Sequence, residues 1–140
     1  MSLLIAPFDP AREAALVTGA GNGIGRAIAQ ALVGEGVPTV FADVNPDTVA
    51  AAAKASVRPD LAMTWVGDLA DPAAREALLA EAQSSVGRVT HFVHSASPQR
   101  HERDHLLAVS DETWERMRSV NLDAGFRLGR GISKALIAAK

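Results

Sequence analysis

The sequence predicts an α/β fold, a doubly wound parallel sheet with helices on both faces. Strand-like and helix-like segments alternate four times along 140 residues, an order typical of βαβ units. A glycine-rich turn joins the first strand to the first helix, and an aspartate follows or ends each of the next two strands. Right-handed crossovers then give the strand order 3-2-1-4. Without a linker or repeat, residues 1–140 are expected to form a single domain.

Composition and charge exclude several classes of protein. Hydrophobic residues at 48% and charged residues at 21% are typical of a folded globular domain. A net charge of -2 and the lack of a Lys/Arg run argue against a nucleic-acid partner. There is no cysteine for disulfide or thiolate chemistry. Apolar runs are too short for a signal peptide or a membrane span, so we expect a cytoplasmic protein without a membrane partner.

The expected elements follow from local patterns. Apolar runs rich in strand formers predict strands at residues 14–18, 37–44, 61–66 and 88–95. Helical periodicity after a turn or capping residue predicts helices at residues 23–34, 45–55, 71–85 and 110–140, the last with a kink near Gly125. Residues 1–13 and 98–109 are expected to be a lead-in and a polar loop. The apolar face of the first helix is expected to comprise Ile24, Ile28, Ala31, Leu32 and Val33.

The turn after the first strand carries the clearest chemical signal. Its glycines permit tight backbone conformations and keep Cβ atoms away from a ligand. Unpaired N–H groups and the helix dipole favour a phosphate by up to about 1 kcal/mol. The spacing is Thr-Gly-x-x-x-Gly-x-Gly rather than Gly-x-Gly-x-x-Gly. We predict a diphosphate cradle made by Thr18, Gly19, Gly21, Asn22, Gly23, Ile24 and Gly25.

This spacing resembles the short-chain dehydrogenase/reductase family, whose Rossmann-like fold binds NAD(P). Further segments match the family in the same order, up to Val120-Asn121-Leu122. The resemblance implies hydride transfer between a nicotinamide cofactor and a small-molecule alcohol or ketone. It covers only the family's N-terminal half, so the chain is expected to be incomplete at its C-terminus and truncated before the fifth strand.

Asp43, at the end of the second predicted strand, predicts a preference for NAD over NADP. A carboxylate there can accept hydrogen bonds from both ribose hydroxyls and repels a 2′-phosphate. Unit charges about 4 Å apart interact by about 4 kcal/mol near a protein surface, and half of that energy gives a preference of roughly tenfold or more. Asn22 agrees, because NADP-using members of the family often carry a basic residue at its position.

The resemblance implies roles for residues at the later strand ends. Asp68 and Leu69 would contact the adenine. Ser95, Ala96 and Ser97 lie where the family reads the end of Asn-Asn-Ala-Gly, a segment that braces the central strand and backs the cofactor; only Ala96 matches outright. Asn121 corresponds to the asparagine that holds a water beside the catalytic lysine, so it is the predicted catalytic residue. His91 and His94 are expected to be ordinary strand side chains.

Two alternatives stay open. The family's chemistry needs a later Ser and a Tyr-x-x-x-Lys pair, whereas this chain has no tyrosine; as given, it is not expected to turn over substrate. It could therefore be a non-catalytic nucleotide-binding module. A zinc hydrolase is the other reading, because His101, Glu102 and His105 fit His-Glu-x-x-His. The polar surroundings and the lack of a third ligand favour a chance match, so no metal is predicted.

The last predicted helix also suggests a partner. It is expected to bury Trp114, Met117 and Leu122 within the chain. A second apolar set is expected to pack against another subunit or the missing half, namely Phe126, Leu128, Ile132 and Leu136. The sequence thus predicts a homo-oligomer.

Overall fold

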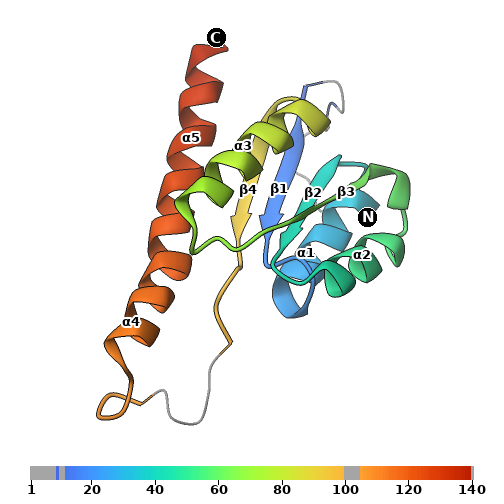
Figure 1. Ribbon diagram of the computed structural model, residues 1–140. Helices are drawn as coiled ribbons and strands as arrows, with labels where there is room; N and C mark the ends of the chain where they lie inside the picture. Colours follow the sequence, from blue (N-terminus) through green and yellow to red (C-terminus); the bar gives the residue numbers. More distant parts are fainter. Residues whose placement is uncertain (1–8, 10–11, 100–104, 140) are drawn as a thin grey trace.

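The computed structural model describes residues 9, 12–99 and 105–139. Its centre is a four-stranded parallel sheet in the order β3-β2-β1-β4, as predicted (Figure 1). The strands are β1 (Ala14–Thr18), β2 (Thr39–Asp43), β3 (Ala62–Val66) and β4 (Val89–His94). The helices are α1 (Gly23–Gly34), α2 (Pro46–Lys54), α3 (Pro72–Val86), α4 (Asp111–Arg118) and α5 (Gly125–Ala138).

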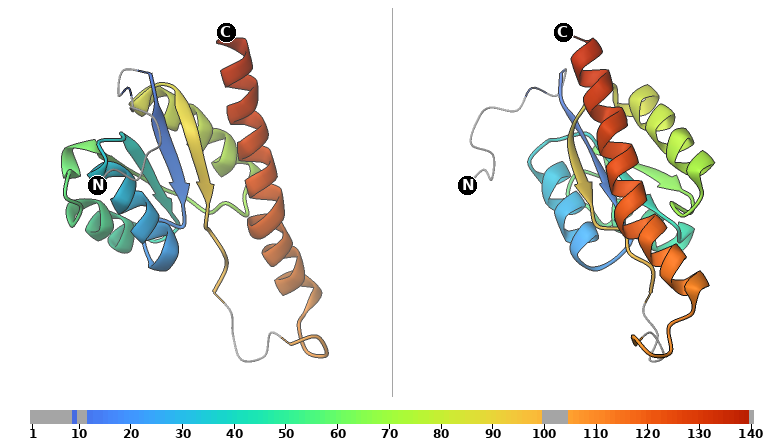
Figure 2. Two further views of the ribbon diagram at one scale, coloured as in Figure 1. Left: turned by 180° about the vertical axis from the view of Figure 1, so that it is seen from behind. Right: turned by 90° about the vertical axis from the view of Figure 1, so that its left-hand side faces the viewer.

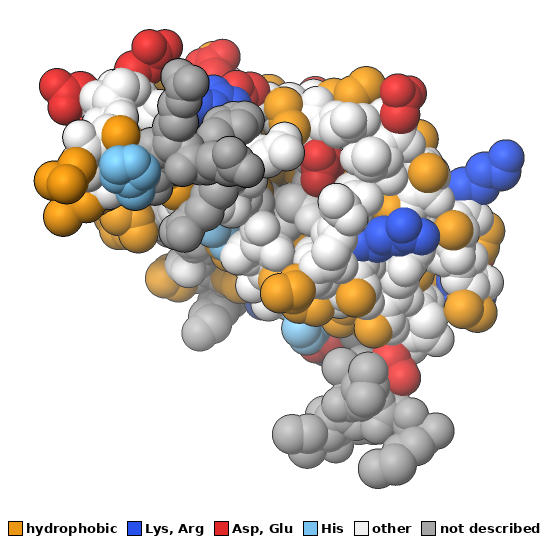
Figure 3. Space-filling model, turned by 90° about the horizontal axis from the view of Figure 1, so that it is seen from below, with side chains coloured by type: hydrophobic (Ala, Val, Ile, Leu, Met, Phe, Trp, Pro, Cys, Tyr) orange, Lys and Arg blue, Asp and Glu red, His pale blue; other side chains and the backbone are white. Residues whose placement is uncertain are grey.

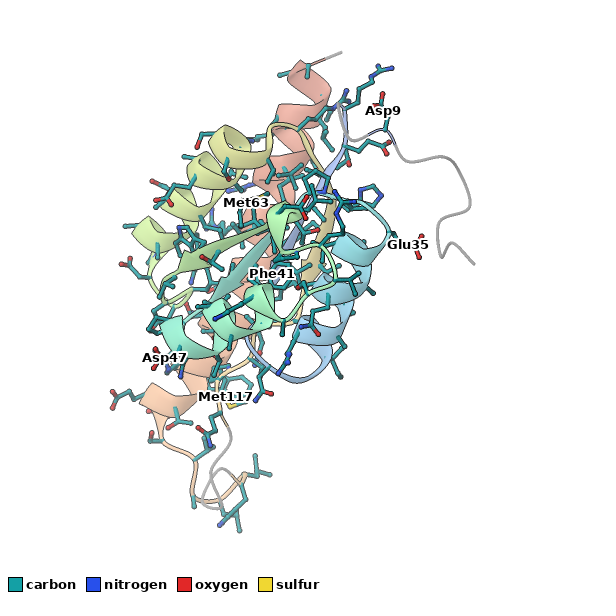
Figure 4. The ribbon with its side chains drawn as sticks, turned by 90° about the vertical axis from the view of Figure 1, so that its right-hand side faces the viewer. Asp9, Glu35, Phe41, Asp47, Met63 and Met117 are labelled. Atoms are coloured by element: carbon teal, nitrogen blue, oxygen red, sulfur yellow. The ribbon has the colours of Figure 1, made fainter. Side chains whose placement is uncertain are left out.

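Helices cover the sheet on both faces, which makes three layers. Helices α1 and α2 lie on one face, whereas α3 and α5 lie on the other (Figures 1 and 2). Alternate side chains of the inner strands feed the two cores, because successive residues of a strand point to opposite faces. Val17 and Phe41 pack with α1 and α2, and Figure 4 shows Phe41 in this layer. Leu16 and Val40 pack with α3 and α5.

Side-chain caps start α2, α3 and α4, and α1 has one as well. Asn45 Oδ1 accepts the N–H groups of Asp47 and Thr48, at 3.0 and 3.1 Å. Asp71 and Ser110 cap α3 and α4 in the same way. Each cap contributes about 0.5–2 kcal/mol by pairing an N–H group that has no partner within the helix.

Some predicted boundaries were wrong by one or two residues. β2 begins at Thr39 rather than 37 because the N–H of Val37 donates to Leu32 O and so belongs to the turn that ends α1. Leu61 lies in a short 3-10 turn, Pro59–Leu61, ahead of β3. The irregularity near Gly125 is a π-helical segment, η2 (Ser119–Ala124), which joins α4 to α5.

The predicted apolar face of α1 was right in part. Val33 is buried, and Ile28 and Leu32 pack against the same core. Ile24 is 75% exposed and Ala31 is exposed, so these two were wrong, whereas Gly25 and Ala29 are buried. These two small residues let the start of the helix lie close to the sheet. Helical periodicity alone did not distinguish the buried residues of α1 from the adjacent row of apolar residues that contains Ile24.

The last helix corrects two further predictions. Leu128 and Ile132 are buried in the chain's own core, with Leu136 packed against it, so they do not await a partner. Trp114 and Leu122 are exposed rather than buried, whereas Met117 is partly buried.

Helix α5 approaches α3 closely at one glycine. A Cβ on Gly131 would meet Leu79 Cδ2, the end of a flexible side chain, which would then have to move aside. Among the helices that the structure describes, none combines the length and the apolar character that a membrane span needs.

Phe41→Ala tests the core beneath α1 and α2. Phe41 has no exposed surface, so its truncation should lower the free energy of unfolding by about 3–5 kcal/mol in a urea titration. Val57→Ala, at a position that is 83% exposed, should change it by less than about 0.5 kcal/mol. Similar losses of unfolding free energy in the two variants would contradict the assignment of Phe41 to the core beneath α1 and α2.

Candidate functional site

The carboxyl ends of all four strands meet at one edge of the sheet, which Figure 3 views directly. The chain leaves β1 toward one face and β4 toward the other, and ligands of open α/β sheets bind at such a switch point. A cleft opens beside this point. Its lining comes from the ends of all four strands, from α4 and from η2. The lining residues are Gly19, Ala42, Asp43, Val44, Gly67, Asp68, Leu69, Ala96, Ser97, Pro98, Arg116 and Val120.

The glycine-rich turn passes tightly between β1 and α1. Gly19 has φ of 68°, a left-handed value that strains other residues. A Cβ on Gly25 would lie 2.2 Å from Gly19 O, so the turn closes only with glycine there. Asn22 caps α1 through Oδ1, which accepts the N–H of Gly23 at 2.8 Å. No acidic residue occupies the first turn of α1, so the positive end of this helix is open to an anion.

Asp43 lies against this turn. Its Oδ2 accepts the N–H of Gly21 at 2.8 Å, and its Oδ1 accepts the N–H of Asn45 at 3.0 Å. Each carboxylate oxygen can accept a second hydrogen bond. Two residues distant in the sequence, Gly21 and Asp43, are thus in direct contact, as the predicted site requires.

Asp68 lies on the opposite wall with an ionic partner. Its Oδ1 accepts the N–H of Ala70 at 2.9 Å, and its Oδ2 accepts from Arg116 Nη1 at 3.0 Å. Partial burial raises the pKa of Asp68, but these two hydrogen bonds and the charges of Arg116 and Arg75 outweigh it, so the pKa is lowered. The carboxylate is therefore charged at neutral pH. Leu69 lines the cleft too, although its side chain is mostly buried in the core.

Thr18 ties the segment after β4 to the end of β1. Its Oγ1 accepts the N–H groups of Ser95 and Ala96, at 3.2 and 3.3 Å. The same hydroxyl lies 2.8 Å from Nδ1 of His94. Ala96 and Ser97 line the cleft, whereas Ser95 contacts the glycine turn from behind, 3.2 Å from the Cβ that Gly25 lacks.

His94 bridges the sheet and the last helix. Its Nε2 donates to the carbonyl oxygen of Val120 at 2.9 Å, because a carbonyl can only accept. Nδ1 of the neutral ring is then the acceptor for the Thr18 hydroxyl. Gly125 permits this packing, since its Cβ would lie 3.0 Å from the ring. Partial burial lowers the pKa of His94 from 6.5, and its bond to Val120 opposes that effect less strongly.

Asn121 lies in the π-helical segment η2, one residue after Val120. It is partly exposed. Such segments are rare and often mark functional sites, because they shift the side chains that follow relative to a regular helix. The structure thus brings Asn121 next to the cleft lining, but Asn121 itself is not part of that lining.

A comparison with protein families decides the relationship. The model described as short chain dehydrogenase matches residues 13–140. The chain belongs to the short-chain dehydrogenase family. Its four-stranded order and its helical layers are those of short-chain dehydrogenases of known structure.

Individual relatives agree with this assignment. The 2,3-dihydro-2,3-dihydroxybenzoate dehydrogenase of Bacillus subtilis is 33% identical over 126 residues, which are 88% of this chain and 47% of that protein. The 3-oxoacyl-[acyl-carrier-protein] reductase FabG of Escherichia coli is 30% identical over 126 residues, 88% of this chain and 49% of that protein. The chain thus spans about half the length of these curated relatives.

Solved structures agree as well. A short-chain dehydrogenase/reductase from Brucella melitensis superposes with a TM-score of 0.78 at 30% identity, over 89% of this chain and 52% of that one. A metagenomic short-chain oxidoreductase in complex with NADP gives a TM-score of 0.79 at 26% identity, over 94% of this chain and 59% of that one.

Two arginines near the cleft could not be recognised from the sequence. Arg116 and Arg75 reach partners 48 and 44 residues away in the chain, and no local pattern marks such pairs. His94 was assigned as an ordinary strand side chain, without its contacts to Thr18 and Val120. Its position within the 94–97 motif was the available signal.

The zinc interpretation has no structural support. His101 and Glu102 lie outside the described residues, and His105 is exposed in a turn. Among the residues that the structure does describe, no three His, Cys, Asp or Glu side chains form a group that could hold a metal ion. The relatives are dehydrogenases and reductases.

His94→Asn should flatten the pH dependence of stability. Because the folded state lowers the pKa of His94, its neutral form contributes fully above 6.5, and this contribution is lost as the pH falls through the folded pKa. The wild-type free energy of unfolding, measured by urea titration between about pH 5 and pH 7.5, should therefore rise with pH more steeply than that of the variant. His105→Asn, at an exposed position, should keep the wild-type slope; an unchanged slope in His94→Asn would contradict the burial argument.

Proposed function

We propose that this chain is the cofactor-binding part of an oxidoreductase that transfers hydride between a nicotinamide dinucleotide and a small alcohol or ketone. Membership of the short-chain dehydrogenase family supports the reaction class. The observation that carries the binding site is the contact of Asp43 with Gly21. This contact brings the glycine-rich turn, which is suited to a diphosphate, next to the Asp43 carboxylate, which is suited to a ribose. Because the chain spans about half of its relatives, the whole protein's activity is part of the proposal.

The residues present fit such a cofactor. The N–H groups of the turn from Gly19 to Gly25 that do not already donate to Ala42, Asp43 or Asn22 would hold the diphosphate, with the positive end of α1 behind them. A Cβ on Gly23 would meet no atom within 4 Å, so the turn has an open side. Asp43 would accept hydrogen bonds from the adenosine ribose, and Asp68 with Leu69 would line the adenine end. The cofactor, when bound, supplies or accepts the hydride; the chain's own residues bind and orient it.

The proposal includes a preference of the chain for NAD over NADP. Asp43 supports it, because an anion in contact with the turn repels a 2′-phosphate. Several structural neighbours are described with NADP or NADPH, including L-sorbose reductase from Gluconobacter frateurii and a 3-oxoacyl reductase from Agrobacterium tumefaciens. Those cofactors belong to those proteins; the acidic Asp43 is the ground on which this chain is proposed to differ.

Asp43→Asn tests the preference directly. Asparagine keeps an acceptor for the N–H of Gly21 and removes the charge, so the ratio of the NADP to the NAD dissociation constant should fall by about tenfold in isothermal titration calorimetry. Asp47→Asn makes the same change in charge at an exposed position on α2 and should leave the ratio near the wild-type value. Equal affinities for the two cofactors in the unmutated chain would overturn the role of Asp43.

Asn121 is proposed to belong to the catalytic group of the parent enzyme. Its place in η2, beside the cleft lining, supports this role. The tyrosine and lysine of the family's later half would supply the proton transfer, and this chain has no tyrosine. A non-catalytic nucleotide-binding module is the second candidate, favoured by that same composition. The cytoplasmic location stays a prediction from the sequence.

We also propose that a second copy of the chain covers the outer face of the last helix. Large apolar side chains on this helix are mostly exposed, namely Trp114, Leu122, Phe126 and Ile137. Large apolar side chains exposed along one helical segment favour an interface. The helix lies beside β4 at the edge of the sheet, where it is accessible (Figure 1).

Phe126→Ser should weaken this self-association. Removing the ring from an interface costs about 2 kcal/mol or more, so the dimer dissociation constant from sedimentation equilibrium should rise by about thirtyfold. Val57→Ser, at an exposed position of the α2–β3 connection, should not change it. A wild-type chain that sediments as a monomer at all concentrations would contradict the proposal.

A further inference from the structure

Arg75 is a buried cation that is not part of the cleft lining. It lies on the first turn of α3 and is 7% exposed. Its Nε donates to Leu69 O at 2.7 Å, and its Nη2 donates to Ala70 O at 3.0 Å. Nη2 also donates to the carbonyl oxygen and the hydroxyl of Ser119. Burying a guanidinium group is costly unless such acceptors surround it.

The acceptors come from two elements that line the same cleft. Leu69 and Ala70 belong to the loop after β3, whereas Ser119 begins the π-helical segment η2. Ser119 Oγ also donates to Ala70 O at 3.1 Å, which closes a small network. The planar guanidinium group offers several N–H donors in a fixed fork, so one side chain can join acceptors that lie in different directions.

The network continues to functional residues at both ends. The N–H of Ala70 donates to Asp68 Oδ1, so Ala70 links the Asp68 carboxylate to Arg75. On the other side, Ser119 is followed within η2 by Val120 and Asn121. The carbonyl oxygens of Ser119 and Val120 both accept side-chain hydrogen bonds, from Arg75 and His94. Side chains that bind helix carbonyls in this way are a recognised cause of irregular helical turns.

We propose that Arg75, acting with Ser119, is a positioning residue that couples the adenine end of the cleft to Asn121. A base held at Asp68 and Leu69 would fix the loop after β3. Arg75 would pass that constraint to Ser119, and so set the register of η2 and the position of Asn121. The inference rests on the proposed function in one respect, since it takes the ligand at this loop to be an adenine nucleotide.

Nuclear magnetic resonance of the 140-residue chain tests the coupling without turnover. The probe is AMP, which carries the adenine and ribose but no nicotinamide. In the ¹⁵N-labelled wild type, AMP should shift the amide signals of Asp68 and Leu69 and also those of Asn121 and its η2 neighbours. In Arg75→Lys, which keeps the charge but has a single nitrogen, the shift at Asn121 should fall by about threefold or more relative to that at Leu69. Arg127→Lys, at an exposed position of α5, should respond like the wild type.

Ser119→Ala provides a second variant that leaves the buried charge in place. It should reduce the response at Asn121 as Arg75→Lys does, and hydrogen exchange of the η2 amides without ligand should become about tenfold faster. Wild-type responses at Asn121 in both variants would overturn the coupling while leaving the binding site intact. No shift at Asp68 and Leu69 in the wild type would overturn the proposed site, and the coupling with it.

Discussion

The hydroxyl of Thr18 is the interaction on which the cleft depends. Thr18 has no exposed surface, and burying a hydroxyl without partners costs about 1–3 kcal/mol. Its oxygen accepts the N–H groups of Ser95 and Ala96 and lies against Nδ1 of His94. These bonds hold the exit of β4 beside the exit of β1. Gly19 passes through the remaining space, where a Cβ would lie 2.8 Å from the backbone of Ala96.

The two carboxylates of the cleft meet different electrostatic surroundings. Asp43 is held by backbone N–H groups, whose dipoles leave its net charge in place. Asp68 faces Arg116 across the cleft, and the charges of Arg116 and Arg75 act on it. The end beside the glycine turn is therefore more negative than the end beside β3. This difference in charge is the ground for the proposed preference for a ligand without an added phosphate at the sugar.

Much of the fold could be predicted because the relevant signals are local. Asn45, Asp71 and Ser110 cap helices through bonds to residues two or three positions away. The position of Asp43 at the end of β2 was predicted correctly, because the carboxyl ends of parallel strands lie at the same edge of the sheet. The exposure of Ile24 could not be predicted in this way. Whether a helix buries its large or its small residues depends on how closely it approaches the sheet, which the chain's other segments decide.

Long-range contacts explain the remaining differences. The bonds of Arg75 to Ser119 and of Arg116 to Asp68 join residues more than forty positions apart. Arg75 of α3 and His94 of β4 donate to carbonyl oxygens of the π-helical segment, and periodicity, which predicted one helical stretch with a kink near Gly125, carries no sign of such partners. Leu128 and Ile132 were expected to pack against another subunit or the missing half, whereas α3 of the same chain provides their apolar neighbour.

Helix α5 contacts α3 at Gly131, far from the end of the helical segment that carries Arg116. From Gly131 to Arg116 the helical chain extends roughly 22 Å, at about 1.5 Å per residue. A tilt of about 3° at the contact with Leu79 would thus displace the far end by about 1 Å. Asn121 lies along the same arm. A larger side chain at position 131 would therefore act on the Arg116 side of the cleft to the extent that it tilts α5 rather than displaces the terminal methyl group of Leu79.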